Sequence, residues 1–135
     1  EGLSSILTGK LFSLNQVFGE LVQWAAGESY PVQSFAPYTV ECHPLIQTDK
    51  SRIVVHLVNY KVDIEGNIIE EKDTRLKVLL PEGTKVKKVK LVSPDDVTEK
   101  VLEIKEVNEN GQNYVEFVVP SVSIYSLAVI DYLVR

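Results

Sequence analysis

Alternation of apolar and polar positions with a period of two dominates the chain from about residue 32 onward, and β-branched residues are common there. The strongest segment, residues 52–60, is almost continuously apolar, which predicts a central strand covered on both faces. Further strands are predicted at residues 38–46, 75–80, 86–92, 101–107, 113–119 and 121–131. No helices alternate with these strands, so the pattern favours antiparallel sheets over a parallel α/β sheet.

Residues 13–27 carry a helical period instead, because apolar residues recur there at intervals of three and four positions. Ser13 is the predicted N-cap, and Gly27 stands where a left-handed residue would end the helix. The apolar stripe is too large to remain in water, so we expect it to face a neighbouring domain in a parent protein. In this chain alone it must fold back on the sandwich or pair with a second copy, and we expect the second copy. This predicted association face comprises Leu14, Val17, Phe18, Leu21, Val22 and Trp24.

Together these elements predict an all-β fold, an antiparallel β-sandwich of immunoglobulin-like or similar Greek-key type, preceded by one N-terminal α-helix. We interpret residues 1–27 as an N-terminal segment and helix from the tail of a preceding domain, and residues 28–135 as the sandwich domain. Asn110-Gly111, between two alternating runs, predicts a tight hairpin. The alternating lysines of residues 85–90 predict an edge strand.

Composition and charge exclude several classes of function. The 135 residues are 44% hydrophobic with a formal net charge of −5, which suits one globular domain with a buried core. An acidic chain lacks the basic surface that binds phosphate backbones or anionic lipids, so we expect neither nucleic acid nor membrane as a partner. No signal peptide is visible, which predicts a cytoplasmic protein.

The sequence contains no methionine, not even at position 1, and only one cysteine. A complete, unprocessed translation product begins with methionine, so we expect this chain to be a piece of a longer protein. Low methionine and cysteine together with many lysines and glutamates are also typical of thermophilic proteins.

The residues indicate no catalytic, cofactor or metal site. Cys42 is the only cysteine, and His43 and His56 are too few for a histidine-rich metal site. Cys42 and His43 are adjacent on a predicted strand, so their side chains point to opposite faces and cannot easily share a proton. Carboxylates such as Asp63 and Glu65 lie in polar loops without the aromatic residues that build a sugar subsite. We therefore expect no catalytic residue, no cofactor and no metal.

A carbohydrate-binding surface is one alternative function. Sugar-binding modules present several aromatic side chains on one exposed surface, because sugar rings stack on aromatic faces. Tyr30, Tyr38 and Tyr60 are the candidates for such contacts, since each lies in or beside a predicted loop. Carbohydrate is the ligand that this alternative implies.

Two stretches together resemble one protein family. Residues 21–28, Leu-Val-Gln-Trp-Ala-Ala-Gly-Glu, followed by Pro31-Val32, resemble the end of the last helix in a glutamine-amidotransferase-like domain. Residues 52–60, Arg-Ile-Val-Val-His-Leu-Val-Asn-Tyr, resemble the strand that opens the C-terminal β-sandwich of the same proteins. These proteins are glycoside hydrolases of the family 42 β-galactosidase type.

The resemblance implies the place of this chain in a larger protein, and it implies no catalytic activity of the chain itself. In such proteins the two catalytic carboxylates lie in a (β/α)₈ barrel, so no residue of this chain inherits a catalytic role. The resemblance implies a non-catalytic C-terminal accessory domain with a structural or assembly role, partnered by the other domains of the parent chain. We also expect a homo-oligomer. A carbohydrate-binding module and a generic immunoglobulin-like interaction domain stay open as alternatives.

Overall fold

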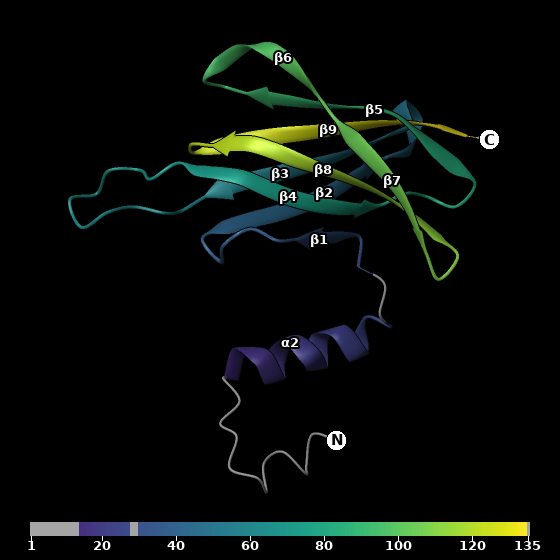
Figure 1. Ribbon diagram of the computed structural model, residues 1–135, viewed down its shortest axis with the longest axis horizontal. Coiled ribbons are helices and arrows are strands. Elements are labelled where there is room, and N and C mark those ends of the chain that lie inside the picture. The colour runs from purple at the N-terminus through teal and green to yellow at the C-terminus, as the bar shows by residue number, and fades with distance from the viewer. Residues whose placement is uncertain (1–13, 28–29, 135) are drawn as a thin grey trace, which may run out of the picture. The chain divides into compact units, whose positions relative to one another are not determined.

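The structure is a computed structural model that describes residues 14–27 and 30–134. The chain divides into two compact units, Glu1–Tyr30 and Pro31–Arg135. The first unit contains helix α2 (Leu14–Ala25), and the second contains all the strands that the structure describes, labelled β1 to β9 in Figure 1.

Helix α2 forms where the helical period predicts it. The predicted N-cap, Ser13, lies outside the described residues. At the other end, the Ala26 N–H donates to the carbonyl of Val22 (2.9 Å) and the Gly27 N–H donates to the carbonyl of Trp24 (3.2 Å). Gly27 has a φ of +68°, the left-handed conformation that glycine adopts without steric cost. The prediction that Gly27 ends the helix is therefore confirmed.

The second unit is a sandwich of two sheets. The four-stranded sheet has the order β1-β4-β8-β7 and consists of β1 (Val32–Ser34), β4 (Glu71–Leu79), β8 (Gln112–Val122) and β7 (Ile104–Glu109). The five-stranded sheet has the order β2-β3-β9-β5-β6 and consists of β2 (Val40–Gln47), β3 (Arg52–Asn59), β9 (Tyr125–Val134), β5 (Thr84–Ser93) and β6 (Asp96–Leu102). A 3₁₀ helix, η1 (Thr48–Lys50), connects β2 to β3. Every pair of neighbouring strands is antiparallel, so the predicted all-β antiparallel sandwich is confirmed.

The core lies between the two sheets and is almost entirely aliphatic. Each strand sends alternate residues inward, because successive side chains of a strand point to opposite faces. Burying one large aliphatic side chain stabilises the fold by about 1.5–3 kcal/mol, so these positions hold the two sheets together. The largest fully buried side chains are Ile53, Val55 and Leu57 of β3, Leu76 and Val78 of β4, Val89 of β5, Val115, Val119 and Val122 of β8, and Ile130 of β9.

Strand β3 matches the prediction for residues 52–60 most closely. It lies between β2 and β9, so it is an internal strand as expected. Its inward residues are fully buried, but only Val54 is buried on the outward side, where His56 and Val58 are half-buried. The expected cover on both faces is therefore complete on one face and partial on the other.

The β7–β8 hairpin turns as the sequence predicts. Asn110 has a φ of 50° and Gly111 a φ of 78°, so both turn residues are left-handed. This is the backbone of a two-residue type I′ turn, whose twist matches that of the flanking strands.

Two expectations about strands are wrong. Residues 101–107 are not one strand, because β6 of the five-stranded sheet ends at Leu102 and β7 of the four-stranded sheet begins at Ile104. Strand β5 is not an edge strand, because it lies between β9 and β6. Its lysines point away from the core, where Lys88 lies 3.9 Å from Asp131 of β9. Charges on the outer face of an internal strand therefore produced the edge-like pattern.

Candidate functional site

The histidines and the cysteine form no catalytic group among the described residues. His43 is exposed on the edge strand β2, with Nε2 3.1 Å from Glu41 Oε2. His56 is half-buried opposite it on β3, with Nδ1 2.6 Å from the Tyr125 hydroxyl. Cys42 points the other way, and burial raises the pKa of its thiol, so the nucleophilic thiolate is disfavoured. The part of the chain that the structure describes holds no group of three His, Cys, Asp or Glu residues arranged to bind a metal ion.

The predicted association face lies on helix α2 and is exposed as far as its side chains are described. Phe18 is 68% exposed and Trp24 81% exposed, and Val17, Leu21 and Val22 are exposed as well. Leu14 begins the helix, but its side chain lies outside the described residues. None of the helices in residues 14–27 and 30–134 is long and apolar enough to cross a membrane.

The three candidate tyrosines belong to different units. Tyr38 is almost fully exposed and Tyr60 is exposed, and both flank the same end of the β2–β3 pair, where the Tyr60 N–H donates to the Thr39 carbonyl (2.8 Å). Tyr30 is half-buried and belongs to the N-terminal unit. Tyr38 and Tyr60 are therefore both exposed on the sandwich, and their backbones lie close together at one end of the β2–β3 pair.

The outer face of the five-stranded sheet carries an apolar surface that the sequence did not single out. Residues paired across antiparallel strands point to the same face, so the register defines this surface. Leu45, Val54 and Val129 form one row across β2, β3 and β9, and His56, Leu127 and Val92 form the next row across β3, β9 and β5. We call Leu45, Val54, Val58, Val92, Leu127 and Val129 the aliphatic face.

Burial varies across the aliphatic face. Val54 is 6% exposed, Leu45 at the edge is 51% exposed, and the four other members are half-buried. Tyr125 lies beside Val58 in the register, and its hydroxyl is bound to His56. Charged residues border the surface on β5, where Lys90 pairs with Glu99 of β6 at 2.5 Å. The surface is thus an apolar centre with a polar border, which is the arrangement typical of a protein contact site.

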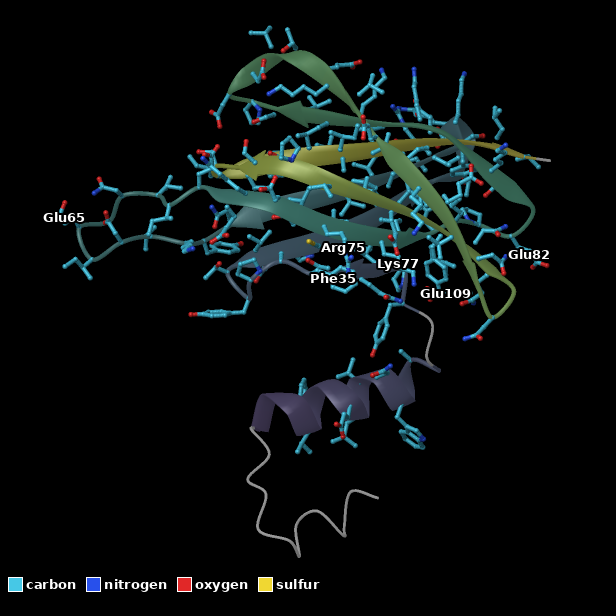
Figure 2. The ribbon with its side chains drawn as sticks, in the orientation of Figure 1. Phe35, Glu65, Arg75, Lys77, Glu82 and Glu109 are labelled. Carbon is cyan, nitrogen blue, oxygen red and sulfur yellow. The ribbon has the colours of Figure 1, made fainter. Side chains whose placement is uncertain are left out.

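The outer face of the four-stranded sheet is organised differently, as Figure 2 shows for its labelled residues. The Arg75 guanidinium lies over the ring of Phe35, 4.0 Å from its centroid. The Lys77 ammonium lies 4.5 Å from the centroid of the Tyr114 ring and forms an ion pair with Glu109. Lys77 is buried although it is a lysine, because the ring and the carboxylate together replace its water. We call this surface the charged face.

One structural asparagine joins the two sheets at the end of β3. Asn59 is buried, and its side-chain N–H groups donate to the carbonyls of Ile69 (2.8 Å), Val122 (3.1 Å) and Ser123 (2.8 Å). Its Oδ1 accepts from the Lys61 N–H (2.9 Å). These bonds satisfy backbone groups that would otherwise be buried without partners. An asparagine that ends an apolar strand was the sequence signal for this role, and it was missed.

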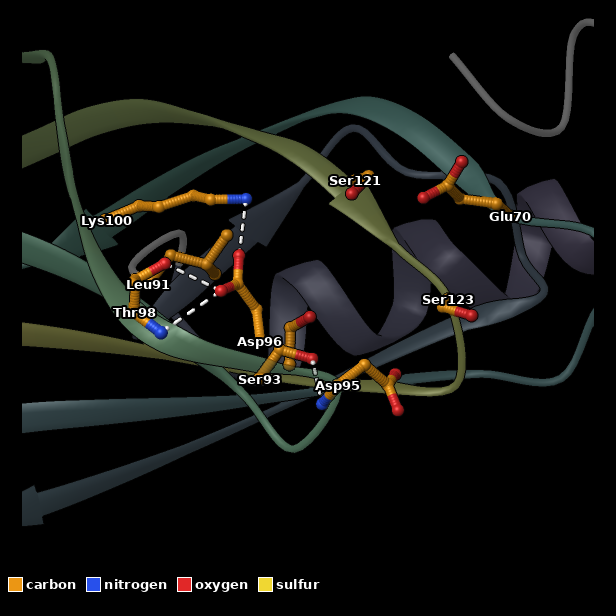
Figure 3. A pocket seen from close by; sticks show the side chains of 10 residues that line it. Glu70, Leu91, Ser93, Asp95, Asp96, Thr98, Lys100, Ser121 and Ser123 are labelled. Carbon is orange, nitrogen blue, oxygen red and sulfur yellow. Dashed lines mark hydrogen bonds and ion pairs between the residues drawn. The ribbon is translucent and has the colours of Figure 1, made fainter.

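A small pocket of about 150 Å³ opens between the β5–β6 turn and the β8–β9 turn, shown in Figure 3. Among the carboxylates that line it, Asp96 has the most polar contacts. One of its oxygens accepts from the Thr98 hydroxyl (2.6 Å) and N–H (3.1 Å), and the other lies 2.9 Å from Lys100 Nζ. These contacts hold the pKa of Asp96 well below its usual range, so this carboxyl is unsuited to act as a general acid.

No model of a known protein family matches the chain, and no curated protein matches its sequence. The fold is similar to part of the α-L-fucosidase isoenzyme 2 from Paenibacillus thiaminolyticus, with a TM-score of 0.61 and 22% identity over 83% of this chain and 17% of that chain. It is also similar to part of a cycloisomaltooligosaccharide glucanotransferase from Paenibacillus sp., with a TM-score of 0.58 and 18% identity over 73% of this chain and 16% of that chain. The chain thus spans about a sixth of the length of each enzyme. At this level of identity the likeness establishes the β-sandwich fold, which the chain shares with parts of two carbohydrate-active enzymes.

Proposed function

We propose that the chain is a non-catalytic accessory domain of a carbohydrate-active enzyme, and that its aliphatic face packs against a neighbouring domain of the same polypeptide. The aliphatic face is the observation that carries this proposal. A sheet surface with an apolar centre across four neighbouring strands resembles half of a domain interface.

The energetics favour a large, permanent contact over an occasional one. Val92, Leu127 and Val129 are only half-buried, so covering them would remove further apolar surface from water at about 25 cal/mol per Å². The border of the surface is charged but internally paired, for example through Lys90 and Glu99. A partner can therefore cover the centre of the aliphatic face without burying an unpaired charge.

The finer identity of the parent enzyme rests on the sequence resemblance. We infer a glycoside hydrolase of the family 42 β-galactosidase type, in which α2 is the last helix of the preceding domain and the sandwich is the C-terminal domain. The similarity of the sandwich to parts of a fucosidase and a glucanotransferase supports the wider class of carbohydrate-active enzymes. In such a protein the partners of this chain are the other domains of its own polypeptide.

Carbene footprinting of aliphatic and aromatic side chains tests the docking proposal. Leu45 and Tyr125 should be labelled strongly in this 135-residue chain and several-fold less in the polypeptide encoded by the complete gene. Phe35, on the charged face, is the matched control and should be labelled equally in both proteins. Equal labelling of Leu45 and Tyr125 in the two proteins would contradict the proposal.

The absence of catalysis is tested separately. The pure 135-residue chain should not hydrolyse aryl glycosides, because we propose that the catalytic carboxylates lie in another domain. Turnover by the chain that disappears on replacing one of its own aspartates or glutamates would overturn this part of the proposal.

A further inference from the structure

A groove of about 520 Å³ lies where the chain passes from β6 to β7, beside the outer surface of β8. Ile104 of β7 and Val118 of β8 contribute its aliphatic lining. Its size falls within the range of about 300–1,000 Å³ typical of small-molecule sites. Five charged side chains surround the lining: Asp73, Arg75, Glu103, Lys105 and Glu116.

The charged side chains of this groove lack ionic and hydrogen-bond partners within the described part of the chain. Among the described residues, none of the five forms an ion pair or a side-chain hydrogen bond. Lys105 and Glu116 are even register partners across β7 and β8, yet they remain unpaired. Elsewhere on the sandwich, lysines such as Lys77, Lys90 and Lys100 are paired with carboxylates. Both donors and acceptors are therefore free at one concave site.

Arg75 has an aromatic contact but no anionic partner among the described residues. Its guanidinium rests on the Phe35 ring, and the two strands are fixed there by the hydrogen bond from the Phe35 N–H to the Arg75 carbonyl (3.0 Å). Figure 2 shows the two labelled residues close together on the charged face. A stacked guanidinium keeps its N–H donors free and loses less rotamer entropy when a ligand binds.

The backbone of the groove is also unusual. Asp73 has a φ of 52° within β4, a left-handed conformation that is uncommon for any residue other than glycine. The register places it opposite Pro120, which has no N–H to complete the ladder. Such conformations persist where the surrounding structure imposes them, and they concentrate at binding sites.

We propose that this groove binds a short neutral oligosaccharide. Sugar hydroxyls both donate and accept hydrogen bonds, so they match a site in which Asp73, Glu103 and Glu116 accept while Arg75 and Lys105 donate. The near balance of three acidic and two basic groups favours a neutral ligand over an anion or a strong cation. The C–H faces of sugar rings would contact Ile104 and Val118 in place of the exposed aromatic rings that sugar-binding modules present. The site is separate from the aliphatic face and from the tyrosine candidates, so it goes beyond the docking role proposed above.

Titrations followed by amide chemical shifts of the whole 135-residue chain test the proposal. The probes are three neutral tetrasaccharides, cellotetraose, isomaltotetraose and β-1,4-galactotetraose. At least one should cause saturable shifts at Ile104, Lys105 and Val118. The variant Arg75→Gln should weaken that binding by about tenfold or more, because it removes charge-assisted hydrogen bonds.

Matched variants keep the test decisive. Lys72→Gln removes a positive charge from the same strand at a position that does not line the groove, and should leave the affinity within about twofold. Glu116→Gln should also weaken binding, which protects the test if Arg75→Gln perturbs the fold. The proposal fails if no tetrasaccharide gives saturable shifts, or if both groove variants bind as the parent does. It also fails if a charged tetrapeptide shifts the same amides at lower concentration than any sugar.

Discussion

The two outer faces of the sandwich lie over the same aliphatic core, but they differ in how their side chains are shielded from water. On the charged face, Lys77 is buried because Glu109 and the Tyr114 ring take the place of water around it. On the aliphatic face, Leu45 is 51% exposed, and Val92 and Leu127 are half-buried side chains with no polar group of their own to satisfy. Around Lys77 the first surface satisfies its buried charge within the chain, whereas the second gains stability only when something covers it.

This difference separates folding from assembly. A polar group that finds its partner inside the domain contributes to the stability of the isolated domain, because removing one member leaves the other unsatisfied. An apolar residue that remains half-exposed contributes less to folding and more to association. Substitutions on the charged face should therefore lower the free energy of unfolding, and substitutions on the apolar surfaces should change what the chain binds.

The largest loss of stability should come from replacing a residue that links the two sheets, because this change affects both faces alike. Asn59→Ala should lower the free energy of unfolding by about 3 kcal/mol, because it leaves several backbone groups without their partner. Urea denaturation at neutral pH measures this. Asn108→Ala, which removes an exposed hydrogen bond to Asn113, is the control and should cost less than about 0.5 kcal/mol. Similar losses for the two variants would show that Asn59 does not join the sheets energetically.

A second prediction sharpens the contrast on the charged face. Lys77→Ala should destabilise the chain by about 2 kcal/mol, since it removes both the ion pair with Glu109 and the cation–π contact of a buried lysine. Lys72→Ala, five positions earlier on the same strand and exposed, should cost less than about 0.5 kcal/mol. Thermal and urea unfolding of both variants give the comparison. Equal stability of Lys77→Ala and Lys72→Ala would mean that the charged face is no more complete than the aliphatic one.

The apolar stripe of helix α2 should affect association and leave folding unchanged. We expect the 135-residue chain to self-associate through this stripe, and Phe18→Glu with Leu21→Glu should convert it to a monomer while the β-sheet circular dichroism is retained. Gln23→Glu adds a negative charge on the polar side of the helix and should leave the oligomer intact. Light scattering measures the mass. A monomeric parent chain would refute self-association and would leave the neighbouring domain as the partner of the stripe.

The smallest effect concerns the stability in acid that Asp96 provides, in the small pocket between the β5–β6 and β8–β9 turns. The Thr98 hydroxyl and then Lys100 lower the pKa of Asp96 in the folded chain, so its stabilising contribution is present above the ordinary carboxyl pKa of about 3.9 and is lost as pH falls below it. Asp96→Asn should therefore be slightly less stable than the parent near neutral pH. The difference in urea midpoint should shrink as the pH is lowered toward about 2. A difference that grows on acidification would contradict this assignment.

The sequence predicted the local elements well because local physics determines them. The continuous apolar run of β3 requires an internal strand, and Asn110-Gly111 adopts the two left-handed conformations that a tight hairpin needs. The crossing between β6 and β7 was missed, because apolar alternation continues through residues 101–107 and the change of sheet depends on distant partners. The lysines of β5 were misinterpreted for the same reason, since an outer face and an edge both leave lysines in solvent.

The candidate sites were less predictable than the elements. The aliphatic face draws its members from β2, β3, β5 and β9, and only the strand order places them on one surface. The groove depends on Arg75 and Glu116, which are 41 positions apart in sequence but lie on neighbouring strands. Asn59 also acts through Val122 and Ser123 from the far end of the chain. Long-range pairing, which local periodicity does not encode, assembled each of these sites.

Pro44 affects how prone the newly made polypeptide is to aggregate before its apolar surface is covered. It lies within β2, the outermost strand of the five-stranded sheet, in register with Val55. A proline has no N–H to offer, so a strand from another molecule cannot form an uninterrupted ladder along this border. A newly synthesised domain whose apolar surface is still uncovered is thereby protected from edge-to-edge aggregation.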